Sequence, residues 1–156
     1  MRNNMIVANQ PHDVAIEMVH ASGWLVAHNT VLLLDPAPGL TWGMEARFSD
    51  SQGTFAYNLT NLDIWHDRDG AQGTLNGNNT NAQSNWFVNV ATGDLHLVAA
   101  ATAVIDHAAP LPQVSDDFDG HGRPVGAVPD IGADEYGSVP FEPTAWIYLP
   151  LISKGP

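Results

Sequence analysis

The chain has 156 residues, of which 44% are hydrophobic, a size and composition typical of one folded domain with a real core. It holds 5 Lys and Arg against 17 Asp and Glu, which gives a formal net charge of −12. A surface this acidic repels phosphate, so we expect neither a nucleic-acid partner nor an anionic membrane, and favour cations or neutral sugars as ligands. The absence of Cys excludes disulfides, zinc–thiolate sites and Cys nucleophiles.

The two ends of the chain carry no membrane signal. The first residues, MRNNMIV, lack the apolar stretch of a signal peptide, so any export signal would lie outside this chain. The apolar runs, such as residues 31–34, are far below the ~20 residues that a membrane span needs. The terminal segment AWIYLPLISKGP (145–156) favours an edge strand or hydrophobic plug over an anchoring or sorting signal.

Strand signals dominate the first half of the chain. Segments rich in Val, Leu, Phe, Tyr and Trp alternate with turn residues, and no helical stripe is sustained, with one short alternative at 14–19. The polar stretch 66–85 predicts a loop, and the strand rhythm stops after residue 110. The expected strands lie within 5–10, 23–34, 42–49, 53–65 and 85–90.

An asparagine recurs at the strand ends. Asn9, Asn29 and Asn58 each follow a short apolar strand, and Asn85 opens another. Their spacing falls in the period range of solenoid proteins. In a parallel β-helix, such residues can stack their amides along the axis, each donating to the next. The alternative is that they are ordinary turn residues that tolerate a left-handed backbone.

The second half of the chain carries four motifs in order. They are GDLHL (93–97), TAVID (102–106), DFDG (117–120) with Arg123, and DIGA (130–133) with Glu135. Together they resemble the C-terminal signature of secreted right-handed parallel β-helix proteins of the choice-of-anchor type, which are related in fold to pectate lyases. In that family the second motif reads SPAID followed by Gly, whereas here His107 follows Asp106.

The resemblance implies an all-β fold, the last few coils of a right-handed parallel β-helix with a C-terminal cap. We therefore expect coils over 1–105, a capping segment over 106–136, and a Pro-containing linker with a short apolar tail over 137–156. The resemblance also implies a bacterial protein that is extracellular or on the cell surface. It implies further N-terminal coils, without which the first rung has an exposed edge.

The acidic motif is a candidate calcium site. Asp116, Asp117 and Asp119 flank a Gly, and carboxylate oxygens are the ligands that Ca²⁺ prefers. The full EF-hand pattern is absent, because His121 stands where a third Asp or Asn is expected.

A structural clamp is the favoured alternative for the same motif. Arg123 can form paired hydrogen bonds with a carboxylate, which would close the capping segment on itself. The candidate partners of Arg123 are Asp119, Asp130 and Glu135.

The segment DIWHDRD is the densest cluster of mixed charge and a weak candidate for catalysis. In polysaccharide lyases of the resembling fold, an Arg or Lys base acts beside Ca²⁺, and a glycosidase would instead need two carboxylates. The bland alternative is a solvated surface with weak ion pairs. The candidate catalytic residues are Asp63, His66, Asp67 and Arg68.

Aromatic residues are weak candidates for carbohydrate binding. Trp24, Trp42 and Trp65 recur roughly once per expected coil, and sugar rings stack on exposed aromatic faces. Core Trp residues are the alternative. The seven His residues show no metal-binding spacing, although a site assembled across coils stays an alternative.

Three functions fit these observations. The first is a non-catalytic extracellular module associated with carbohydrate. The second is the C-terminal part of a polysaccharide lyase or glycoside hydrolase, which would show a cleft with Arg or Lys facing Ca²⁺. The third is a structural surface stalk. A row of exposed Trp residues along one face would favour the binding module.

Overall fold

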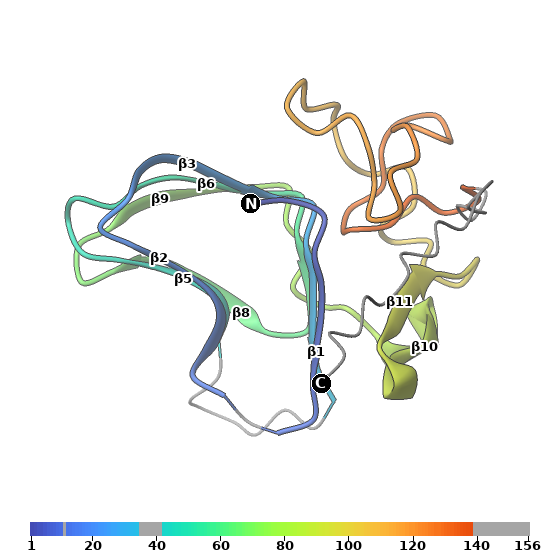
Figure 1. Cartoon of the computed structure of the whole chain (residues 1–156), viewed down its shortest axis with the longest axis horizontal. Coiled ribbons are helices and arrows are strands. Elements are labelled where there is room, and N and C mark those ends of the chain that lie inside the picture. The colour runs from blue at the N-terminus through green and yellow to red at the C-terminus, as the bar shows by residue number, and fades with distance from the viewer. Residues whose placement is uncertain (11, 35–41, 139–156) are drawn as a thin grey trace, which may run out of the picture.

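The computed structural model describes residues 1–10, 12–34 and 42–138, and it is all-β. Of the expected linker and tail (137–156), residues 139–156 lie outside these ranges. Nine of the strands form three parallel sheets (Figure 1). The first sheet contains β1 (Met5–Ala8), β4 (Thr30–Leu33) and β7 (Leu59–Thr60). The second contains β2 (Val14–Val19), β5 (Trp42–Arg47) and β8 (Asp63–Arg68). The third contains β3 (Ser22–Ala27), β6 (Gln52–Ala56) and β9 (Gln72–Asn76).

The three sheets stack in a solenoid-like arrangement that is compatible with a β-helix. Each turn of the chain adds one strand to each sheet, and Figure 1 shows the turns superposed around a common interior. That interior is filled by inward-facing side chains from all three sheets, including Ile16, Val31, Met44 and Phe55. Burial of these side chains supplies the main stabilisation of the turns.

Two local expectations differ from the structure. The helix considered at 14–19 is strand β2, because Ile16 faces the interior and the strand pairs with β5. The stretch 66–85, expected as a loop, contains the end of β8 and all of β9. Its polar side chains are tolerated because the outer face of β9 is exposed, while its backbone continues the sheet. The signal was the repeated tripeptide Gln-Gly-Thr, which aligns 72–74 on 52–54.

One corner of each turn has the same construction. A residue with positive φ stands between the third sheet and the first, as in His28 (φ 50°), Tyr57 (φ 52°) and Gly77 (φ 62°). An Asn follows each of these three residues, and Asn3, also with positive φ, precedes Asn4. The left-handed conformation bends the chain sharply from one sheet into the next (Figure 1), and the following Asn then points along the stack.

These asparagines form a continuous ladder. The Nδ2 of Asn4 donates to Oδ1 of Asn29 (2.7 Å), Asn29 to Asn58 (2.9 Å), and Asn58 to Asn78 (2.8 Å). Each Oδ1 also accepts from the backbone N–H of the preceding Asn in the ladder. The stacking predicted for Asn29 and Asn58 is confirmed. The ladder ends at Asn4 and Asn78, and the expected Asn9 and Asn85 are not part of it, because a ladder Asn follows the corner residue of positive φ and not the end of a strand.

Beyond β9 the chain leaves the stacked sheets. The short 3-10 helices η1 (Ser84–Trp86) and η2 (Val90–Thr92) flank β10 (Phe87–Asn89), which pairs antiparallel with β11 (Asp94–Leu97). Residues 98–138, here called the C-terminal segment, contain turns and isolated bridges but no further named strand. They pack with β10 and β11 around a second apolar cluster that includes Leu32, Leu59, Leu95 and Val104.

The C-terminal segment lies along the side of the stack, whereas a cap across its end was expected (Figure 1). The N–H of Gly132 donates to the carbonyl of Tyr57, and that of Ala133 donates to Oγ1 of Thr30 (both 2.9 Å). At Gly132 (φ 108°) a Cβ would lie 2.8 Å from Oγ1 of Thr30, so only Gly fits this approach. The apolar outer face of the first sheet needs this cover, which explains the lateral position.

We predict that Asn58→Ala destabilises the fold by about 2–4 kcal/mol, because it orphans buried partners in two neighbouring turns. The side chain of Asn58 is fully buried and also donates to the carbonyl of Val26 (2.9 Å). Urea unfolding followed by circular dichroism measures the change. The exposed Asn81 provides the control, and Asn81→Ala should change stability by less than ~0.5 kcal/mol. Equal effects of the two substitutions would contradict the role of the ladder.

Candidate functional sites

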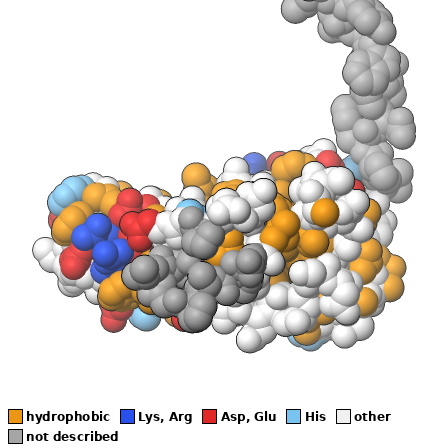
Figure 2. All heavy atoms as spheres, turned by 90° about the horizontal axis from the view of Figure 1, so that it is seen from below, with side chains coloured by type: hydrophobic (Ala, Val, Ile, Leu, Met, Phe, Trp, Pro, Cys, Tyr) orange, Lys and Arg blue, Asp and Glu red, His pale blue; other side chains and the backbone are white. Residues whose placement is uncertain are grey.

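An aromatic and charged surface lies on the outside of the second sheet. Its two Trp rings, Trp42 and Trp65, have centroids 4.8 Å apart with an interplanar angle of 55°. The guanidinium carbon of Arg68 lies 4.8 Å from the ring centre of Trp65, a cation–π contact. Figure 2 shows basic side chains among acidic and hydrophobic ones on this lower side of the molecule. We call the surface the Trp–Arg face and define it by Glu17, Trp42, Glu45, Trp65 and Arg68.

Two glutamates lie at the centre of the Trp–Arg face. Glu45 is fully buried, and its Oε2 accepts from Nη1 of Arg68 at 2.6 Å. The Oε1 of Glu45 has no hydrogen-bond partner among the described residues. Glu17 occupies the register position next to Glu45 on β2. Burial, followed by the neighbouring carboxylate of Glu45, raises the pKa of Glu17 above its ordinary value.

A second arginine extends the Trp–Arg face toward the next corner. Arg47 contacts Asp69 through Nη2 (2.6 Å) and lies 3.8 Å from Glu17. Its positive charge lowers the pKa of Glu17 and so partly offsets the effect of Glu45. The side chain of Glu17 is 37% exposed, so this carboxyl is accessible to a ligand. Aromatic faces beside accessible polar groups can stack on a sugar ring and hydrogen-bond its hydroxyls.

Of the four candidate catalytic residues, Arg68 alone belongs to the Trp–Arg face as defined above. All four belong to β8, but Arg68 pairs with Glu45, and no ion pair joins it to Asp63 or Asp67 among the described residues. The sequence analysis missed Glu17 and Glu45. The alternation in GMEAR was the available signal, because it turns Glu45 outward between the inward-facing Met44 and Ala46. The other candidates, Asp63, His66 and Asp67, lie along β8 with Arg68.

Trp24 lies apart from the other two candidate aromatic residues. It stands on β3, where its ring packs against Phe55 with a centroid distance of 4.7 Å. Its indole N–H is buried without a hydrogen-bond partner among the described residues. Trp24 therefore contributes to packing at the third sheet, and of the three candidate Trp residues Trp42 and Trp65 are the two that contact each other.

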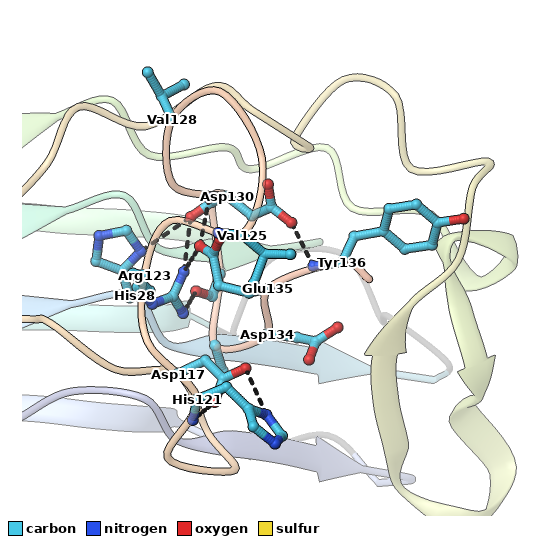
Figure 3. Close-up of polar contacts among 12 residues, drawn as sticks. His28, Asp117, His121, Arg123, Val125, Val128, Asp130, Asp134, Glu135 and Tyr136 are labelled. Atoms are coloured by element: carbon cyan, nitrogen blue, oxygen red, sulfur yellow. Dashed lines mark hydrogen bonds and ion pairs between the residues drawn. The ribbon is translucent and has the colours of Figure 1, made fainter. Parts of the chain in front are cut away.

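The clamp motif gathers around Arg123 (Figure 3). Nη1 of Arg123 donates to Oε1 of Glu135 at 2.5 Å, and both side chains are only 1% exposed. The same guanidinium donates to the carbonyls of Asp116, Asp130 and Gly132. The arginine thus ties four positions of the C-terminal segment together. Asp119 is not among its partners.

Buried carboxylates in the clamp accept from the backbone. Glu135 accepts from the N–H groups of Val125 (3.0 Å) and Asp130 (2.7 Å). The carboxylate of Asp130 accepts from the N–H groups of Asp106 (2.7 Å) and Tyr136 (2.6 Å). Burial raises the pKa of Asp130 to about 6, although these hydrogen bonds lower it. The acidic side chains therefore replace the hydrogen bonds that a sheet would supply.

Of the three calcium candidates, Asp116 stands apart from Asp117 and Asp119. Asp116 forms an ion pair with Arg2 of the first turn, and its carboxylate also accepts from Asn3. Oδ1 of Asp117 accepts from two N–H groups of its own loop. Asp119 faces His96, with Oδ2 and Nε2 2.8 Å apart.

Comparison of this chain with protein-family models, with curated proteins and with solved structures finds no match. The choice-of-anchor resemblance of the C-terminal motifs therefore stays a prediction. Within the described ranges, no helix has the length and hydrophobicity to cross a membrane.

The buried His28 links the clamp to the stacked sheets. Its Nδ1 lies 3.0 Å from the carbonyl oxygen of Asp130, and its Nε2 has no hydrogen-bond partner among the described residues. Burial, followed by the positive charge of Arg123, lowers the pKa of His28 to about 3. The imidazole is therefore neutral at physiological pH and donates through Nδ1.

We predict that the neutral His28 makes folding sensitive to acid. In the unfolded chain His28 takes up a proton near pH 6.5, but in the folded chain only near pH 3, so stability is complete above ~6.5 and is lost as the pH falls toward 3. The raised pKa of Asp130 acts in the opposite direction between about pH 6 and 4. Urea unfolding of the wild type and His28→Gln at several pH values separates the two effects. Relative to His28→Gln, the free energy of unfolding of the wild type should fall by about 3 kcal/mol between pH 7 and pH 4. A difference between the two proteins that stays constant with pH would contradict this prediction.

Proposed function

We propose that the stacked sheets belong to a right-handed parallel β-helix of the choice-of-anchor, pectate-lyase-like type. Two observations support this. The asparagine ladder repeats at one corner of successive turns. The DFDG motif with its Arg and the DIGA motif with its Glu also meet in one buried cluster, through the contact between Arg123 and Glu135.

We propose that the chain is an extracellular, carbohydrate-associated module that binds a polysaccharide on the Trp–Arg face. The observation that carries this proposal is the contact between two partly exposed Trp rings beside an accessible carboxyl and two arginines. Tilted rings suit successive sugar units of one chain, which present their apolar faces at different angles. The net charge of −12 favours a polysaccharide that is neutral overall.

We predict that Trp65→Ala weakens polysaccharide binding at least tenfold, because the substitution removes the ring between Trp42 and Arg68. An array of plant and bacterial polysaccharides identifies the ligand, and calorimetry measures the affinity. Phe118→Ala is the matched control, since Phe118 is another aromatic residue, 47% exposed, on the C-terminal segment. Binding that survives Trp65→Ala but not Phe118→Ala would move the site to the C-terminal segment.

A polysaccharide lyase or hydrolase is the second candidate function. The observation that favours it is the adjacent position of Glu17 and Glu45, next to Arg68. A carboxyl whose pKa is raised by burial and by a second carboxyl keeps its proton to higher pH than a free carboxyl, which suits a general acid. On this reading Glu17 donates the proton, while Arg68 keeps Glu45 in position.

If the chain cleaves its ligand, we predict that Glu17→Gln lowers turnover at least ~100-fold and leaves binding within a few-fold of the wild type. Reducing-end release and absorbance of unsaturated products measure turnover on each polysaccharide that binds. Asp67→Asn serves as the control, because Asp67 is an exposed carboxyl of the neighbouring strand β8. A wild-type chain that binds a polysaccharide without cleaving it would leave the binding module as the function.

A further inference from the structure

A group of acidic and imidazole side chains lies on the C-terminal segment, apart from the residues of the Trp–Arg face. Asp117, Asp119 and His121 each offer one ligand atom, and these atoms lie within 4.8 Å of one another. Asp119 also belongs to a second triad of this kind, with His96 and Asp134. Figure 3 shows Asp117 and His121 turned toward each other below the clamp.

The carboxylate of Asp117 is only half used. Its side chain is fully buried, and Oδ1 accepts from the N–H groups of Asp119 (3.0 Å) and His121 (2.8 Å). Oδ2 is buried and has no hydrogen-bond partner among the described residues, and neither has Nδ1 of His121. A buried carboxylate oxygen without a partner is costly, so it points to a ligand that supplies positive charge.

The spacing of these two atoms suits a metal ion better than a hydrogen bond. Oδ2 of Asp117 and Nδ1 of His121 are 3.4 Å apart. A charge-assisted hydrogen bond would bring them to about 2.7–2.9 Å. Two ligands bound to zinc at about 2.0–2.2 Å in tetrahedral geometry lie roughly 3.4 Å from each other. Asp117 and His121 are thus placed as one edge of such a site.

The third ligand is held in place by a neighbouring histidine. Nε2 of His96 lies 2.8 Å from Oδ2 of Asp119, and Nδ1 of His96 lies 2.6 Å from Oδ1 of Asp94. The hydrogen bonds from Asp94 through His96 to Asp119 orient the carboxylate of Asp119. The other oxygen of Asp119, Oδ1, is left for an ion. Hydrogen-bonded partners of this kind commonly fix the ligands of metal sites.

A cleft open to solvent reaches one member of the group, Asp119. It has a volume of about 290 Å³, and its lining includes His96, Asp119 and Asp134. Asp134 is buried, and its Oδ2 accepts from the N–H of Leu97 at 2.7 Å. The carboxylates of Asp119 and Asp134 therefore give the cleft a negative lining, which attracts cations.

We propose that Asp117, Asp119 and His121 bind one divalent transition-metal ion of the zinc type. The imidazole nitrogen decides the class of metal, because Ca²⁺ is bound by six to eight oxygen atoms, whereas zinc readily accepts a mixture of nitrogen and carboxylate oxygen. The site replaces the all-carboxylate calcium site expected from the sequence, since Asp116 is engaged by Arg2. It uses none of the residues of the Trp–Arg face, so it can be tested independently of carbohydrate binding.

Equilibrium dialysis of the untagged full chain against Zn²⁺, after removal of metal with EDTA, tests the proposal. We expect saturation at one ion per chain, and a rise in the melting temperature with added Zn²⁺. A large excess of Ca²⁺ should not displace the bound zinc. Uptake well below one ion per chain would overturn the proposal, and displacement by Ca²⁺ at equal concentration would overturn the metal class.

Two substitutions and one control locate the ion. Asp117→Asn keeps the Oδ1 acceptor that holds the loop and removes only the free carboxylate oxygen, and His121→Ala keeps the backbone donor. Each should weaken zinc binding at least tenfold in a chain whose circular dichroism is unchanged. The control is His20→Ala, because His20 and Asp50 form an exposed pair 2.9 Å apart with no buried carboxylate beside it. Zinc binding that survives His121→Ala, or is lost in the control, would overturn the proposed site.

Discussion

The fold depends on one side-chain amide at one corner of each turn. Where the chain passes from the third sheet to the first, the backbone leaves the parallel ladder, and its N–H groups need other acceptors. The Oδ1 of the next asparagine in the stack is that acceptor, as Oδ1 of Asn58 is for the N–H of Asn29. The same oxygen accepts from the Asn29 side chain, so the turn and the stacking of neighbouring turns are fixed together. Both residues are fully buried, which makes the arrangement specific.

The corner also determines where the C-terminal segment docks. His28, Thr30 and Tyr57 surround the ladder and meet the backbone of that segment. Beside the backbone–backbone hydrogen bonds of the segment, buried carboxylates accept from several of its remaining N–H groups, and Arg123 balances the charge of Glu135. The acidic motif is therefore mainly a substitute for regular structure. The one buried carboxylate oxygen of the motif that backbone and side-chain donors leave unused, within the described residues, is Oδ2 of Asp117.

Local composition was enough to predict strands, stacking and the pairing of Arg123 with Glu135, because each follows from a short motif. It was not enough to assign partners across turns. The polar strand β9 resembled a loop, since its outward side chains carry no hydrophobic signal. The partners of Glu45 follow from the register of β2, β5 and β8, which places Glu17 and Trp65 on either side of it. Likewise, Asp119 stands close to Arg123 in sequence, yet the fold places it beside His96, which belongs to a separate motif.

The lateral contacts of the C-terminal segment constrain how the gene can change length. Arg2, Thr30 and Tyr57 belong to three consecutive turns, and each touches that segment. Inserting or deleting residues in the loops opposite this corner would leave the three contacts aligned, whereas removal of one complete turn between them would break the alignment. Duplication of whole turns, a common route of growth in repeat proteins, is thus compatible with this architecture only outside the three turns spanned by the segment.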